Sequence, residues 1–180
     1  MLKTPAGGQT ALAGFEKKLT GNVPDDSDIP GPVRKAVRFM LGGAVVSIVF
    51  AVFDVIILLT DRNAIGSING KPPTSAQVGG AVVWVLVQYA ILTAVWLLMA
   101  RLNRAGRTWA RITGTVLFVI STWQLYQVVN SLRGGEFITV ADIIYLILIL
   151  ATWAAGLGAI AMLWRSESSA YFRERSAAAR

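Results

Sequence analysis

The sequence contains no cysteine and no histidine. The absence of cysteine excludes disulfides, thiolate nucleophiles and iron–sulfur clusters, and the absence of both residues excludes Cys/His zinc sites. The absence of histidine also excludes a Ser-His-Asp triad and a histidine-ligated haem. A glycine-rich phosphate loop of the ATPase type is missing as well. We therefore expect no metal site and no cofactor.

Charged residues are also scarce, at 15% of the 180 residues, whereas an ordinary soluble domain has about 25%. Apolar residues make up 54%, and the mean hydropathy is +0.57. The apolar residues gather in four runs, each close to the about 20 residues that a helix needs to cross a bilayer. These runs are 39–60, 78–100, 112–129 and 143–164. The sequence predicts an all-α integral membrane four-helix bundle.

The 17 Lys and Arg residues are distributed unevenly between the connections. Six precede the first run, four lie between the second and third, four follow the last, and three lie in the other two connections. Because cytoplasmic loops of membrane proteins carry an excess of Lys and Arg, we predict that both termini are cytoplasmic. The transmembrane domain 39–164 then has a cytoplasmic lead, 1–38, and a cytoplasmic tail, 165–180, in a bacterial cytoplasmic membrane.

The net charge of +7 does not indicate nucleic-acid binding, because no aromatic and basic recognition motif accompanies it. Basic residues near the inner leaflet attract anionic lipid headgroups, which explains the charge. The residues expected to contact these headgroups are Arg34, Lys35, Arg38, Arg101, Arg104, Arg107, Arg111 and Arg165.

Three segments outside the runs carry local signals. Leu12, Phe15 and Leu19 have helical spacing, which fits either a short amphipathic helix on the inner leaflet or a frayed terminus. The connection 61–77 contains an Asn-Gly turn signal and a Pro-Pro pair, as in a flexible loop or a lid. The segment 139–142 reads as a capping box that opens the fourth helix.

The tail is expected to continue the fourth helix into the cytoplasm. A solvated helix and a helix that docks a partner both fit its alternating charges.

Asp54 is the residue of most chemical interest, because it lies inside the first run. Along a helix axis, Asp54 would lie about 24 Å from Arg38 and about 10 Å from Asp61. An ionised carboxylate in the hydrocarbon region needs a partner, yet no Lys or Arg lies within any run. Asp54 therefore serves either as an interhelical hydrogen-bond acceptor or as a proton or cation site.

Polar residues in or next to the other runs fall at a height along the membrane normal similar to that of Asp54, and they suggest a vestibule that opens outward. They are Gln88, Tyr89, Gln124, Gln127, Asp142 and Tyr145.

Small residues at four-residue spacing predict where two helices approach closely. One ridge lies on the same side of the first helix as Asp54, and a matching ridge lies on the fourth helix. We expect the two ridges to touch. They consist of Gly43, Ser47 and Ala51, and of Ala151, Ala155 and Ala159.

The sequence RAGRTWAR occupies positions 104–111, LWR occupies 163–165, and YF follows at 171–172. In these segments and in its Ala/Val/Gly/Arg-rich composition, the chain resembles small four-span actinobacterial membrane proteins of unknown function. The resemblance implies the four-span architecture and brings no activity with it.

Two functions fit these observations. The favoured one is an accessory or structural subunit that packs against a larger membrane complex. The expected partner is another membrane protein or, as a homodimer, a second copy of the chain. The alternative is a small proton- or cation-coupled transporter, or a ligand-binding membrane protein, that uses Asp54. An enzyme is the least favoured class, because no nucleophile or metal-ligand spacing accompanies the carboxylates.

Overall fold

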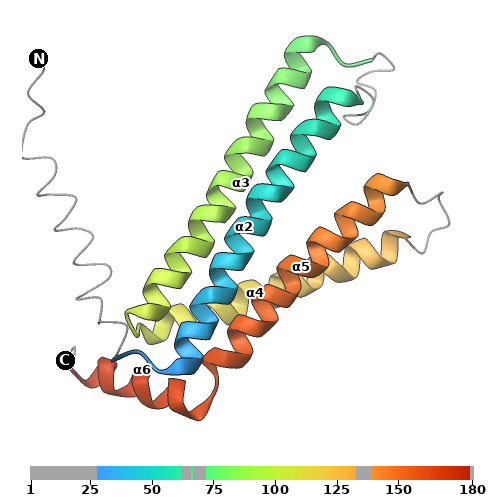
Figure 1. Ribbon diagram of the computed structural model, residues 1–180. Coiled ribbons are helices and arrows are strands. Elements are labelled where there is room, and N and C mark those ends of the chain that lie inside the picture. The colour runs from blue at the N-terminus through green and yellow to red at the C-terminus, as the bar shows by residue number, and fades with distance from the viewer. Residues whose placement is uncertain (1–27, 62–65, 67–71, 133–138, 179–180) are drawn as a thin grey trace, which may run out of the picture.

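The computed structural model describes residues 28–61, 66, 72–132 and 139–178. Helices are the one kind of regular secondary structure among these residues. The helices are α2 Gly31–Thr60, α3 Ser75–Arg104, α4 Thr108–Leu132, α5 Val140–Leu163 and α6 Ser166–Ala178 (Figure 1). The first four are long and apolar enough to cross a membrane, as the sequence predicts. The predicted N-terminal amphipathic helix and the Asn-Gly turn lie outside the described residues.

Polar caps set where α3 and α5 begin, and they lie before the apolar runs. The predicted capping box is confirmed: the Thr139 backbone N–H donates to Asp142 Oδ2 at 2.8 Å, and the Asp142 N–H donates to Thr139 Oγ1 at 3.2 Å. A second box joins Thr74 and Gln77 at the start of α3. Helix α2 follows Pro30 and begins several residues before the apolar run. The helices are therefore longer than the runs.

The four long helices form two antiparallel hairpins, α2 with α3 and α4 with α5 (Figure 1). The hairpins meet where α2 and α4 begin and α3 and α5 end, a region that we call the base, and they diverge away from it (Figure 1). The most extensive contacts run from α3 to α2, from α2 to α5 and from α5 to α4, so the helices follow one another in a row. Helices α3 and α4 also contact each other, but less extensively. This arrangement is more open than the expected bundle. Lipid tails are as apolar as these side chains, so no hydrophobic force closes such a bundle in a membrane.

The buried core lies at the base. It takes residues from every helix, including α6, and it contains Ile29, Val33, Ala36, Met40, Met99, Ala100, Leu102, Ala110, Ala159, Leu163, Tyr171 and Phe172. Farther from the base, most large apolar side chains of the four long helices are exposed.

Helix α6 corrects the expectation that the tail continues the fourth helix. The chain turns at Trp164 and Arg165, and α6 lies across the base (Figure 1). The turn is held by Ser168 Oγ, which donates to the Met162 carbonyl at 2.8 Å. Ser168, Tyr171 and Phe172 share one helix face and are buried. The tail helix therefore docks, but on its own chain.

Candidate functional site

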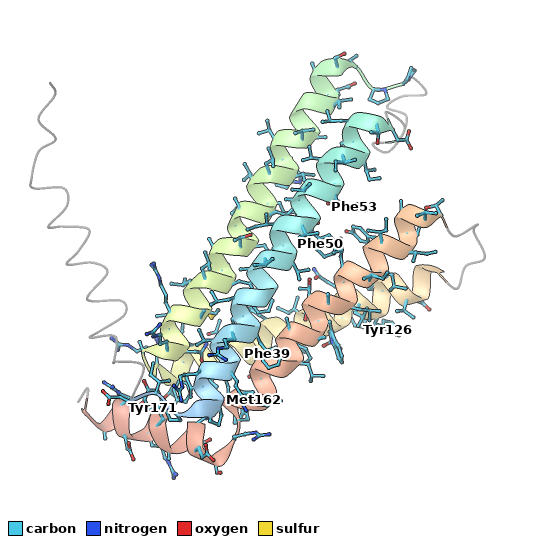
Figure 2. All side chains as sticks on the ribbon, viewed as in Figure 1. Phe39, Phe50, Phe53, Tyr126, Met162 and Tyr171 are labelled. Carbon is cyan, nitrogen blue, oxygen red and sulfur yellow. The ribbon has the colours of Figure 1, made fainter. Side chains whose placement is uncertain are left out.

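Asp54 lies in a polar and aromatic cluster that joins three helices. The Tyr89 hydroxyl on α3 donates to Asp54 Oδ2 on α2 at 2.8 Å. The Phe50 ring stacks on Tyr89, with centroids 5.7 Å apart, and meets Tyr145 of α5 edge-on at 5.3 Å. Phe50 lies between α2 and α5 (Figure 2) and is only 6% exposed. The cluster therefore ties α3 and α5 to the central helix α2.

Phe50 is the member of the cluster that the sequence analysis missed. It precedes Asp54 by four residues, so both side chains lie on one face of α2. An aromatic residue one turn from a carboxylate within an apolar run is the signal that points to it.

The interaction that the structure shows within this cluster is hydrogen bonding. Asp54 is partly buried and accepts one strong hydrogen bond, which leaves its second carboxylate oxygen for a further donor. Among the described residues, no group of three or more Asp or Glu side chains converges to hold a metal ion. The observed hydrogen bond corresponds to the first of the two roles considered for Asp54, that of interhelical acceptor.

Of the polar residues that the sequence analysis grouped with Asp54, the cluster contains Tyr89 and Tyr145. Gln88 is exposed on α3, and Gln124 and Gln127 are exposed on α4. Helix α4 packs on α5 and not on α2, so its side chains do not reach the cluster. The polar residues share a height along the helices, but they point in different directions and do not converge on a vestibule.

Asp142, the remaining member of the predicted set, is an exposed helix-cap residue.

The expected contact between α2 and α5 is present, and one close approach lies outside the predicted ridges. A Cβ atom at Gly158 of α5 would lie 2.9 Å from the Phe39 ring of α2. Gly43 of the predicted ridge faces α3 instead, since a Cβ atom there would lie 2.7 Å from the Trp96 ring. Small-residue spacing thus marks close packing, but the partner of Gly43 differs from the prediction.

The other ridge residues are distributed as follows: Ser47 and Ala159 are buried, and Ala51, Ala151 and Ala155 are partly buried.

Arg111, one of the predicted headgroup contacts, makes contacts within the chain. Its guanidinium Nη1 donates to Ser169 Oγ at 3.0 Å and to the Leu163 carbonyl at 3.4 Å, and the guanidinium carbon lies 4.0 Å from the centre of the Trp164 ring. Arg111 therefore holds α6 against the base. Of the other predicted headgroup contacts, Arg34, Lys35, Arg38, Arg101 and Arg165 are exposed, and Arg104 and Arg107 are partly buried.

Comparison of the chain with protein-family models, with curated proteins and with solved structures finds no significant match. Any statement about function therefore depends on the geometry of this chain.

Proposed function

We propose that the chain is an accessory or structural subunit of a bacterial cytoplasmic membrane, with both termini in the cytoplasm, that packs against a larger membrane complex. The observation that carries this proposal is the exposure of Gln88. It lies near the midpoint of α3, with 13 residues before it and 16 after it in a helix that can cross a membrane.

An exposed amide at this height would face hydrocarbon. Moving such a group from water into a medium without hydrogen-bond partners costs about 4–8 kcal/mol. A partner helix that offers a donor or an acceptor removes this cost, and polar side chains join transmembrane helices in this way. Helices α3 and α4 are the two ends of the row, and α4 carries exposed Gln124 and Gln127. Both ends of the row therefore present polar side chains to a neighbour.

The test is purification of the tagged chain from its native membranes in a mild detergent, followed by mass spectrometry of the retained proteins. We expect one membrane protein to be retained in fixed stoichiometry. Gln88→Leu should reduce its recovery severalfold, because an interhelical hydrogen bond is worth about 0.6–2 kcal/mol. The matched control is Val87→Leu, which changes an exposed apolar neighbour on the same helix. A chain purified alone, or equal recovery with Gln88→Leu, would contradict the proposal.

The second candidate is a small proton- or cation-coupled transporter, or a ligand-binding protein, centred on Asp54. It is favoured by the Asp54–Tyr89 hydrogen bond between α2 and α3, with Tyr145 of α5 beside it. Reconstituted vesicles with an imposed proton gradient test it, because Asp54→Asn removes the titratable group and keeps the oxygen that Tyr89 needs. Transport that this variant abolishes would favour the transporter over the accessory subunit.

A further inference from the structure

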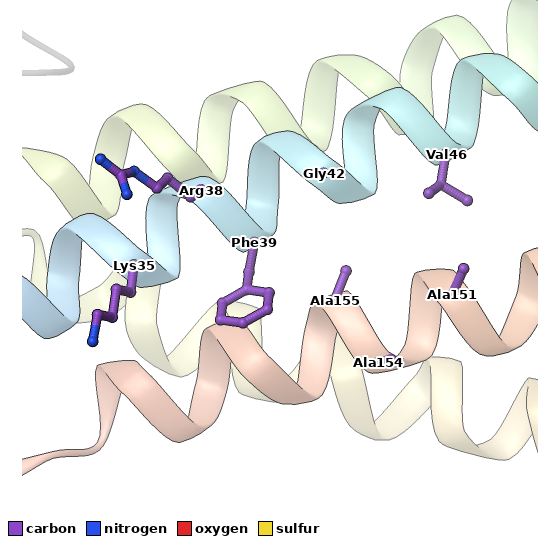
Figure 3. Close-up of a pocket in the computed structure, with 8 residues that line it drawn as sticks. All are labelled: Lys35, Arg38, Phe39, Gly42, Val46, Ala151, Ala154 and Ala155. Atoms are coloured by element: carbon purple, nitrogen blue, oxygen red, sulfur yellow. The ribbon is translucent and has the colours of Figure 1, made fainter.

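A groove of about 590 Å³ runs between α2 and α5 near the base. Its two ends differ in character (Figure 3): Lys35 and Arg38 lie at one end, and the rest of its lining is apolar. The apolar lining consists of Phe39, Gly42, Val46, Ala151, Ala154 and Ala155. We propose that this groove binds one anionic phospholipid of the inner leaflet, with its phosphate against Lys35 and Arg38 and one acyl chain along the apolar part.

The groove exists because small residues face each other across it. Gly42 has no Cβ, and a Cβ atom built there would find no atom within 4 Å. Three alanines line the opposite wall on α5, so the two helices touch at Phe39 and Gly158 and leave space farther from the base. A volume of 590 Å³ falls within the range of about 300–1,000 Å³ that small-molecule sites occupy.

The length of the groove fits one leaflet. Its lining residues on α2 run from Lys35 to Val46, which is about 16 Å at 1.5 Å per residue. Half of a hydrocarbon core of about 30 Å is nearly the same length. The basic pair sits within the first eight residues of α2, at the base, where the inner headgroups lie in the proposed orientation. The inference rests on that membrane placement and not on any partner protein.

Charge favours a lipid over a second copy of the chain as the occupant. A two-fold symmetric dimer presents the same patch from both subunits. Two copies joined through this groove with the same orientation in the membrane would bring two Lys35 and Arg38 pairs together. The like charges would repel, whereas the phosphate of a lipid would attract both side chains.

The experiment uses the full chain reconstituted in vesicles of equal parts phosphatidylglycerol and phosphatidylethanolamine, extracted gently and weighed by native mass spectrometry. We expect one retained phosphatidylglycerol per chain. A basic residue near an anionic surface is worth about fivefold in affinity, so Lys35→Gln with Arg38→Gln should weaken retention about 25-fold. The control, Arg173→Gln with Arg175→Gln, removes two charges of α6 that do not line the groove, and the lipid should be retained.

A second pair of variants tests the apolar part without changing charge. Gly42→Leu fills the groove and should displace the lipid, whereas Gly80→Leu, also in open space but outside the groove, should not. Equal retention of both lipids, or retention unaffected by Gly42→Leu, would overturn the proposal. A wild-type dimer that Gly42→Leu dissociates would assign the groove to a second copy instead. Extraction of the chain from vesicles by alkaline carbonate would overturn the membrane placement itself.

Discussion

The docking of α6 on the base makes a quantitative prediction for Phe172→Ala. Phe172 is 2% exposed and belongs to the core at the base. Replacing a buried phenylalanine with alanine costs about 3–5 kcal/mol, because apolar contacts are lost and a cavity remains. Each step of about 1.4 kcal/mol changes an equilibrium constant tenfold, so a loss of about 3 kcal/mol already raises the population of undocked α6 by about two orders of magnitude.

Trypsin measures this population directly, because Arg173 and Arg175 lie within α6 and can be cut only when the helix opens. Cleavage tracks the open population when opening and closing are fast relative to cutting. We expect the rate of cleavage after Arg173 to rise about 100-fold in Phe172→Ala. Glu167→Ala changes an exposed residue of the same helix and should cleave at the wild-type rate.

A Phe172→Ala rate within threefold of wild type would refute the reasoning, because α6 would then not depend on its buried face. A rise of equal size in Glu167→Ala would show a general weakening of the helix instead. Thermal unfolding of both variants in detergent separates local opening of α6 from loss of the whole base.

Three further predictions follow from individual contacts. Burial raises the pKa of Tyr171 above its ordinary value of about 10. The free energy that docks α6 should therefore be constant below about pH 10 and should fall as the pH rises through the raised pKa. The tyrosinate absorbance of wild type, compared with Tyr171→Phe, measures the shift, and a midpoint at or below 10 would contradict it. Gly43→Ala should lower stability by about 1–3 kcal/mol through its clash with Trp96, whereas Gly42→Ala should be neutral or stabilising by up to about 1 kcal/mol. Denaturant unfolding in detergent compares the two glycines, and equal effects would rule out the packing argument. Asp54→Asn should change stability by less than about 0.6 kcal/mol, because an amide oxygen still accepts the hydrogen bond, and a larger loss in the same assay would mean that the charge itself is stabilising.

Local patterns predicted the four long helices and the capping box at Thr139, because length, hydropathy and cap spacing are properties of neighbouring residues. The height of Asp54, Tyr89 and Tyr145 along the helices followed from counting residues, and these three side chains do meet. Height does not give direction around the axis, which depends on which helices are neighbours. Gln124 has a suitable height, but α4 lies beyond α5 in the row, so it cannot reach Asp54.

The direction of α6 depended on similar non-local information. Nothing in its alternating charges distinguishes a helix that continues α5 from one that turns beneath it. The turn depends on Arg111, which contacts Ser169, Trp164 and the Leu163 carbonyl from a helix more than 50 positions earlier. An arginine just before an apolar run predicts a headgroup contact, and its position in the sequence does not reveal which residues of α6 it contacts.

The proposed partner surface and the proposed lipid site occupy different parts of the row. The groove lies between the two central helices, α2 and α5, whereas Gln88 stands on α3 at one end. Substitutions that share no contact usually have additive effects. A chain that combines Gln88→Leu with the Lys35 and Arg38 substitutions should therefore show the same reduction in partner recovery as Gln88→Leu alone. It should also show the same reduction in lipid retention as the Lys35 and Arg38 substitutions alone. A combined loss larger than additive would mean that the lipid holds α2 and α5 in the arrangement that the partner recognises.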